Sequence, residues 1–189
     1  MVSLMSLWLP ILVSAVLVFF AASIAWMVLP HHKKDYGKLA EEDAVREAIN
    51  KGDNPAGMYV IPYCPDMKAM EDPEIKKKME EGPKGFLTLR DPGYDPQKGM
   101  GACLVIYFLY NLAVSFFCAY LASRFLGPGA DYLTVFQVVG TAAFMAYAFA
   151  VVPTAIWKGV PWTVVWKEVF DGLVYGLLTA GAFGWLWPS

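Results

Sequence analysis

Four long apolar segments dominate the pattern of hydrophobic and polar positions along this chain. Of its 15 basic and 17 acidic side chains, 26 lie within residues 31–100. The apolar segments are Leu4–Pro30, Gly101–Leu126, Leu133–Trp157 and Pro161–Trp187. Each exceeds the ~20 apolar helical residues that cross the hydrocarbon core of a bilayer. The pattern therefore predicts an all-α membrane protein, a four-transmembrane-helix bundle built from residues 1–30 and 101–189.

Residues 31–100 form a polar insert, for which local signals predict a small α+β unit. Leu39–Asn50 has helical periodicity, and Met58–Ile61 and Phe86–Leu89 are short strand candidates that could pair. Asp72 is placed to cap a helix that Pro73 opens and that runs to Glu81. The following Gly-Pro dipeptide should end that helix.

The charges at the end of the first segment indicate its orientation. No Lys or Arg precedes Lys33, so the basic start of a cleaved signal peptide is missing, and we expect a retained helix. The positive-inside rule then places Lys33 and Lys34, and the whole insert, in the cytoplasm and both termini outside. Arg124 is a mild exception to this arrangement. The predicted location is the inner (cytoplasmic) membrane of a bacterium.

The last segment carries a stripe of small residues spaced four apart, which is typical of close helix packing. The stripe consists of Gly172, Gly176, Ala180 and Gly184. Two interpretations remain open: packing against another helix of this chain, or docking of a partner subunit or a second copy. Within the chain, the third segment is the first candidate to pack against the stripe, because it has small residues at the same spacing: Ala142, Ala146 and Ala150.

Few polar side chains lie within the apolar segments. Asn111 should face protein rather than lipid, towards Gln137 of the third segment, because an unpaired amide is costly in hydrocarbon. Lys167, Glu168 and Asp171 form the one charged cluster, and the i,i+4 spacing of Lys167 and Asp171 predicts an interfacial ion pair. The alternative is a proton or ion site, because acids within membrane helices are often functional.

Candidate ligands for a metal or redox group are scarce. The only histidines, His31 and His32, lie at the inner end of the first segment, where Asp35 or Cys64 could join them. The competing interpretation is a headgroup anchor formed with the two following lysines. The three cysteines lack metal-type spacing, and no phosphate-binding, zinc-protease or nucleophile-elbow motif is present. We therefore expect no intrinsic cofactor, and lipid or pigment contacts only through a partner.

Several short motifs resemble those of uncharacterised (hypothetical) small bacterial inner-membrane proteins with four transmembrane helices. They are Leu29-Pro30-His31, Asp72-Pro73-Glu74, Gly82-Pro83, Phe170-Asp171-Gly172 and Gly184-Trp185-Leu186-Trp187-Pro188. The resemblance covers most of the chain and implies no activity or functional residue.

Three functions are consistent with the sequence. The first is a non-catalytic accessory subunit of a larger photosynthetic or respiratory membrane complex, docked through the small-residue faces and surrounded by membrane lipids. The second is a small transporter or an ion or proton pathway that uses Asp171. The third is a metal or redox site at His31 and His32 on the inner face. The net charge of −2 provides no basic surface for nucleic acid, and no small-molecule substrate is indicated.

Overall fold

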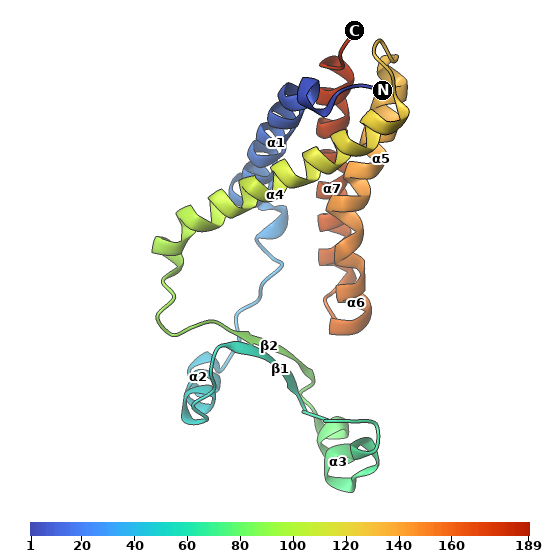
Figure 1. Cartoon of the computed structure of the whole chain (residues 1–189). Coiled ribbons are helices and arrows are strands. Elements are labelled where there is room, and N and C mark those ends of the chain that lie inside the picture. The colour runs from blue at the N-terminus through green and yellow to red at the C-terminus, as the bar shows by residue number, and fades with distance from the viewer. The chain divides into compact units, whose positions relative to one another are not determined.

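The computed structural model describes residues 1–189 and divides them into two compact units (Figure 1). One unit contains residues 1–36 and 100–189, and the other contains residues 37–99. The chain is mostly helical (69%) and has one small two-stranded sheet. The predicted insert began at residue 31, but residues 31–36 belong to the helical unit, because their side chains bond to its last helix.

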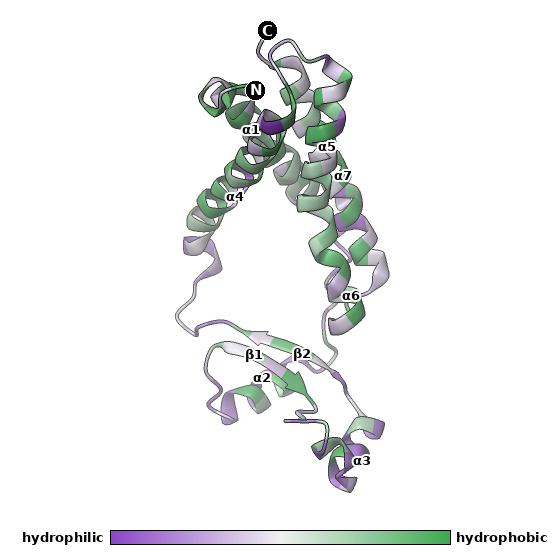
Figure 2. Cartoon of the chain, turned by 45° about the vertical axis from the view of Figure 1, so that its right-hand side comes forward, coloured by the Kyte–Doolittle hydropathy of each residue, from purple (hydrophilic) through white to green (hydrophobic).

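Three helical stretches are long and apolar enough to cross a membrane: Leu4–Val28, Pro96–Phe125 and Tyr132–Lys158. The first contains α1 (Trp8–Ser23), the second is α4 (Pro96–Phe125), and the third contains α5 (Tyr132–Ala148) and α6 (Val152–Lys158). Pro153 lies in the first turn of α6, where its missing N–H is tolerated, and a 3₁₀ turn separates α6 from α5. In Figure 2, apolar residues cover most of these helices.

The last long helix, α7 (Trp162–Trp185), corresponds to the fourth predicted span but is not among the three stretches that are long and apolar enough to cross a membrane. It buries nine residues, more than any other helix, and they include Asp171, Tyr175 and Thr179. A helix enclosed by its neighbours can carry polar groups and glycines that a lipid-facing helix cannot. This position explains how α7 can carry Asp171 and Thr179 among its apolar residues.

The small-residue stripe of α7 packs against α5 within the same chain. A Cβ added at Gly172 would lie 2.9 Å from the Cβ of Ala148, and one at Gly176 would lie 3.1 Å from the backbone nitrogen of Phe144. Farther along this contact between α5 and α7, which we call the seam, a Cβ added at Gly140 of α5 would lie 3.0 Å from the Cβ of Ala180. The stripe is therefore occupied by α5 over most of its length.

The predicted receiving face of α5 is wrong. The residues in the seam are Gly140, Phe144 and Ala148, whereas Ala146 and Ala150 are exposed. Ala142 is partly buried, but it packs in the apolar core rather than in this seam. An offset of two residues turns a helix by about 200°, since 3.6 residues make one turn, so the two sets lie on opposite faces.

The apolar core lies where the beginning of the first helical stretch and the beginning of α5 pack against the C-terminal parts of α4 and α7. Its fully buried members include Leu7, Val135, Val139 and Phe183. The helix α4 crosses the others obliquely, and only its second half contributes to this core (Figure 1). The prediction that Asn111 faces protein is confirmed, since it is fully buried, but Gln137 is exposed and cannot be its partner.

The unit of residues 37–99 contains two short helices and the sheet, close to the predicted positions. They are α2 (Glu42–Lys51), β1 (Gly57–Ile61), α3 (Pro73–Glu81) and β2 (Gly85–Leu89). The strands are antiparallel, with Tyr59 opposite Leu87. The Asp72 carboxylate accepts the backbone N–H of Glu74 at 2.7 Å, as expected for an N-cap. No side chain of this unit is fully buried, so it lacks a closed core of its own.

Candidate functional site

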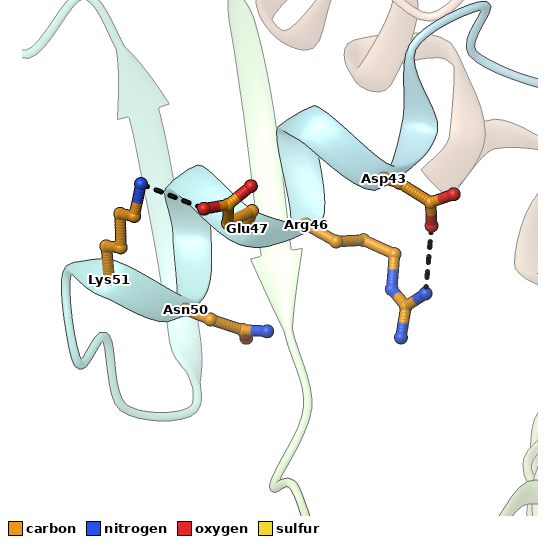
Figure 3. Close-up of a pocket in the computed structure, with 5 residues that line it drawn as sticks. All are labelled: Asp43, Arg46, Glu47, Asn50 and Lys51. Atoms are coloured by element: carbon orange, nitrogen blue, oxygen red, sulfur yellow. Dashed lines mark hydrogen bonds and ion pairs between the residues drawn. The ribbon is translucent and has the colours of Figure 1, made fainter.

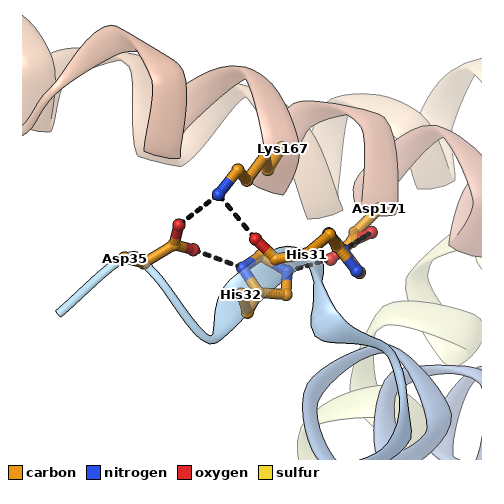
Figure 4. A network of polar contacts seen from close by, with 5 residues as sticks. All are labelled: His31, His32, Asp35, Lys167 and Asp171. Atoms are coloured by element: carbon orange, nitrogen blue, oxygen red, sulfur yellow. Dashed lines mark hydrogen bonds and ion pairs between the residues drawn. The ribbon is translucent and has the colours of Figure 1, made fainter.

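A cluster of five polar residues joins the end of the first helical stretch to α7 (Figure 4). His31, His32 and Asp35 come from the turn that follows α1, whereas Lys167 and Asp171 lie one turn apart on α7. Extended backbone at Leu29 ends the helical stretch, and Pro30 then opens the 3₁₀ turn Pro30–His32. This local break turns both imidazoles towards α7.

His32 is the centre of the cluster and is almost fully enclosed. Its Nε2 lies 2.7 Å from Oδ2 of Asp171, and its Nδ1 lies 2.6 Å from Oδ2 of Asp35. The ring also stacks on the indole of Trp26, with centroids 3.9 Å apart. An ionised carboxylate only accepts hydrogen bonds, so two carboxylates on one ring require both nitrogens to carry a proton. The geometry therefore favours the imidazolium form of His32.

The electrostatics of His32 agree with this geometry. Burial alone would lower the pKa of His32, but the hydrogen bonds and charges of Asp171 and Asp35 outweigh burial and raise the pKa above its ordinary value of 6.5. The second imidazole is arranged differently: Nε2 of His31 lies 3.2 Å from Oδ1 of Asp171, and its side chain is 30% exposed. Asp171 thus bonds to one enclosed histidine, His32, and to one partly exposed histidine, His31.

Asp35 and Lys167 support this core from the other side. The Lys167 ammonium donates to Oδ1 of Asp35 and to the backbone carbonyl of His31, the latter at 2.6 Å. The hydrogen bond from Lys167, followed by that from His32, holds the pKa of Asp35 below its ordinary value. The predicted pair of Lys167 and Asp171 is therefore wrong: each of the two residues bonds to the turn after α1 rather than to the other.

The ligand atoms of His31, His32 and Asp171 lie within 4.8 Å of one another, close enough to hold a metal ion. Two imidazole nitrogens and a carboxylate oxygen are the donors that Zn²⁺, Fe²⁺ and related ions accept. Sequence reasoning named each of these residues but placed them in separate interpretations. The short spacing of His31, His32 and Asp35 was a usable signal, whereas nothing in the sequence linked Asp171 to them.

The other candidates do not join this cluster. Cys64 belongs to the unit of residues 37–99, where its thiol lies 3.1 Å from the backbone oxygen of Asp66. In the same unit, the polar side of α2 forms a shallow surface pocket (Figure 3). Its two ion pairs, Asp43–Arg46 and Glu47–Lys51, are highly exposed, so this surface is a solvated helix face.

Comparison with known proteins gives no independent indication of function. No protein-family model, no curated protein and no solved structure matches this chain. The chemistry of the cluster is therefore the basis for a functional proposal.

Proposed function

We propose that this chain is an integral membrane protein that binds a divalent transition-metal ion through His31, His32 and Asp171. The observation that carries the proposal is the convergence of two imidazole nitrogens on one carboxylate, at 2.7 and 3.2 Å. Its setting is a helical unit that contains three helices capable of crossing a membrane. An intrinsic metal departs from the expectation, drawn from the sequence, that the chain has no cofactor of its own.

The spacing of the donors suits a metal centre. With metal–nitrogen bonds of about 2.0–2.1 Å, neighbouring ligands of a tetrahedral ion lie about 3.3 Å apart. The His31–Asp171 separation of 3.2 Å is already near this value, and the His32–Asp171 pair at 2.7 Å needs only a small opening. Three protein ligands leave at least one coordination position for water or a substrate. The partly exposed side chain of His31 provides the entry side.

Asp35 has the role expected of an outer-shell partner. It bonds to Nδ1 of His32, the nitrogen opposite the proposed metal ligand, and so fixes the ring and its tautomer. A metal ion would replace the proton that Nε2 of His32 shares with Asp171.

The charges around the cluster also favour a divalent ion. A 2+ ion together with Lys167 balances the three carboxylates of Asp35, Glu168 and Asp171 when both histidines are neutral. Glu168 is half-buried and interacts electrostatically with His32, Asp35 and Asp171. Such balance limits the cost of placing a dication in a partly buried site.

Metal titration tests the proposal directly. The full chain, purified in mild detergent with a histidine-free tag and stripped with a chelator, is titrated with Co²⁺ and Zn²⁺. We expect one ion per chain, a Co²⁺ visible spectrum typical of nitrogen and oxygen ligands, and displacement by Zn²⁺. Asp171→Asn and His32→Ala should abolish binding, whereas Cys64→Ser should retain it. Absence of stoichiometric binding, or binding unchanged in both site variants, would contradict the proposal.

A second candidate function is the accessory subunit of a larger membrane complex. One observation favours it: no side chain of residues 37–99 is fully buried, and an apolar cleft of about 550 Å³ lies between α2 and the β1–β2 sheet. Its lining includes Val45, Ile49 and Leu87. A unit without a closed core gains stability when a partner covers such a surface. Docking through the small-residue stripe is no longer part of this candidate, since α5 occupies it.

The two candidates differ in what accompanies the chain through purification. Extraction in mild detergent, a native gel and mass spectrometry of the band should identify a stoichiometric larger complex if the chain is an accessory subunit. An absorption spectrum of the same band would detect haem or pigment in the partners. Migration only as a free monomer or homodimer would exclude the accessory role.

A further inference from the structure

Four buried polar atoms inside the helical unit make no hydrogen bond of good geometry within the protein, and the polar side chains next to them (Tyr107 beside Asn111, Thr179 beside Tyr147, Trp26 beside Tyr175) interact with them only weakly. The four atoms are Nδ2 and Oδ1 of Asn111 and the hydroxyl oxygens of Tyr147 and Tyr175. Asn111 is fully buried, and Tyr175 is 7% exposed. Buried polar groups in proteins are nearly always satisfied, and ordered water completes those that the chain leaves unpaired. Four such atoms in one small unit therefore require a common explanation.

Together with the buried polar side chains on α1, α4, α5 and α7, these atoms make up what we call the polar column. On α7, Asp171, Tyr175 and Thr179 follow one another at intervals of one turn, and all three are buried. The ring of Tyr175 meets that of Tyr147 on α5 edge to face, with centroids 5.7 Å apart. The column thus begins at the carboxylate that bonds His31 and His32.

The column continues towards the middle of the helices. Asn111 and Ser115 lie one turn apart on α4, and both are fully buried. The hydroxyl of Ser115 lies 3.0 Å from that of Ser14 on α1, which joins these two helices deep in the interior. Four different helices therefore contribute polar side chains to one interior region.

Beyond the two serines the interior is apolar except for Ser123, whose hydroxyl donates to the backbone oxygen of Tyr120 at 2.8 Å. Leu7, Val135, Val139 and Phe183 are all fully buried there and pack in one cluster. Unpaired polar groups thus lie towards the histidine end, whereas hydrocarbon side chains and one hydroxyl that is satisfied within its own helix fill the opposite end.

We propose that this column is a hydrated half-channel, which gives water and protons access from the His31–His32–Asp171 cluster to Asn111. Water is the ligand that suits it: an amide and two phenol groups together offer donors and acceptors to a few small molecules, and each water needs two to four such partners. The proposal does not depend on a bound metal, because the four atoms of Asn111, Tyr147 and Tyr175 are distinct from the three proposed ligands.

Silver-ion accessibility tests the half-channel in the full-length protein. Cys64, Cys103 and Cys118 are first replaced by serine or alanine, and a single cysteine is then introduced by Thr179→Cys or, as the control in the apolar plug, by Val139→Cys. Ag⁺ blocks a water-accessible thiol, and later alkylation of the unfolded protein, read by mass spectrometry, reports the fraction that remained free. The thiolate is the reactive form of cysteine. Each unit by which burial raises the pKa of a thiol lowers the thiolate fraction about tenfold.

We expect the thiol at position 179 to be blocked about tenfold faster, or more, than the thiol at position 139. Equal and slow blocking at both positions would overturn the proposal. Asp171→Asn should leave this difference in place even if it abolishes metal binding, so failure of the metal proposal and failure of the half-channel are distinguishable.

Thermal melting provides a second test that does not rely on cysteine variants. Tyr175→Phe removes one hydroxyl and changes nothing else in shape. The comparison is made in a Trp26→Phe background, which removes the indole N–H that interacts with this hydroxyl. If water satisfies the hydroxyl, the melting temperature should fall there, because water loses a hydrogen bond. If the site is dry, the temperature should stay equal or rise, which would overturn the proposal. Tyr132→Phe, at a residue that is 47% exposed, is the matched control and should have no effect.

Discussion

The close contact of α7 with α5 makes a sharp prediction for the substitution Gly172→Ala. The added Cβ would lie 2.9 Å from the Cβ of Ala148 and 3.0 Å from its Cα and backbone nitrogen. Two of these three atoms are backbone, so the neighbour cannot move aside by a side-chain rotation. Overpacking of this kind costs about 1–3 kcal/mol, and it opposes the ~1 kcal/mol that alanine gains over glycine in a helix.

Gly181→Ala is the matched control on the same helix. Its new Cβ would meet only the hydroxyl of Tyr132, at 3.9 Å, which is ordinary van der Waals contact. Both variants share the gain in helix propensity, so the difference between them isolates the clash. We expect Gly172→Ala to be less stable than Gly181→Ala by about 1–3 kcal/mol.

The assay is reversible unfolding of the full chain in mixed detergent, followed by far-ultraviolet circular dichroism. Ala148→Gly combined with Gly172→Ala should recover part of the loss, because it removes the Cβ but leaves the backbone in place. Equal stability of Gly172→Ala and Gly181→Ala would refute the reasoning. The small-residue stripe of α7 would then not pack closely against α5, and docking of a partner on the stripe would again be a viable interpretation.

The polar cluster gives three further predictions. Asp35→Asn should weaken Co²⁺ binding by about 10–100-fold without abolishing it, because it removes an outer-shell partner of His32. Isothermal titration calorimetry would measure the affinity. An unchanged affinity would exclude an outer-shell role for Asp35. Lys167→Met should destabilise the protein by about 1–3 kcal/mol, because it removes the ammonium that bonds to the buried Asp35 carboxylate and leaves His32 as its remaining partner. The exposed Lys158→Met is the control in the same unfolding assay, and equal effects would contradict the prediction. The metal-free protein should be most stable at mildly acidic pH. The raised pKa of His32 contributes stability that is complete below pH 6.5 and is lost as the pH rises through the pKa of His32 in the folded protein. The lowered pKa of Asp35 contributes stability that is present above pH 3.8 and is lost as the pH falls through the pKa of Asp35 in the folded protein. Melting curves across this range, compared with those of His32→Ala, would show the alkaline loss disappear in the variant, and a loss that persists would assign it to another group.

The sequence alone determined the elements whose signals are local. The first three apolar segments became the three helices able to cross a membrane, because a long stretch with little charge has few alternatives to a buried helix. In residues 37–99, Asp72, Pro73 and Gly82 set the bounds of α3, since capping and helix termination depend on neighbouring residues only. These features follow from interactions within a few residues, which a single sequence displays directly.

Only the tertiary structure decided which faces and which distant residues meet. The helix α5 is apolar on all sides, so its sequence carries no moment that selects Gly140 and Phe144 rather than Ala142 and Ala146 for the seam. Asp171 could have paired with Lys167 one turn away, but the turn at Pro30 brings His32 to it across a separation of 139 residues. The free energy of that choice comes from the packing of α1 on α7, which no local pattern encodes.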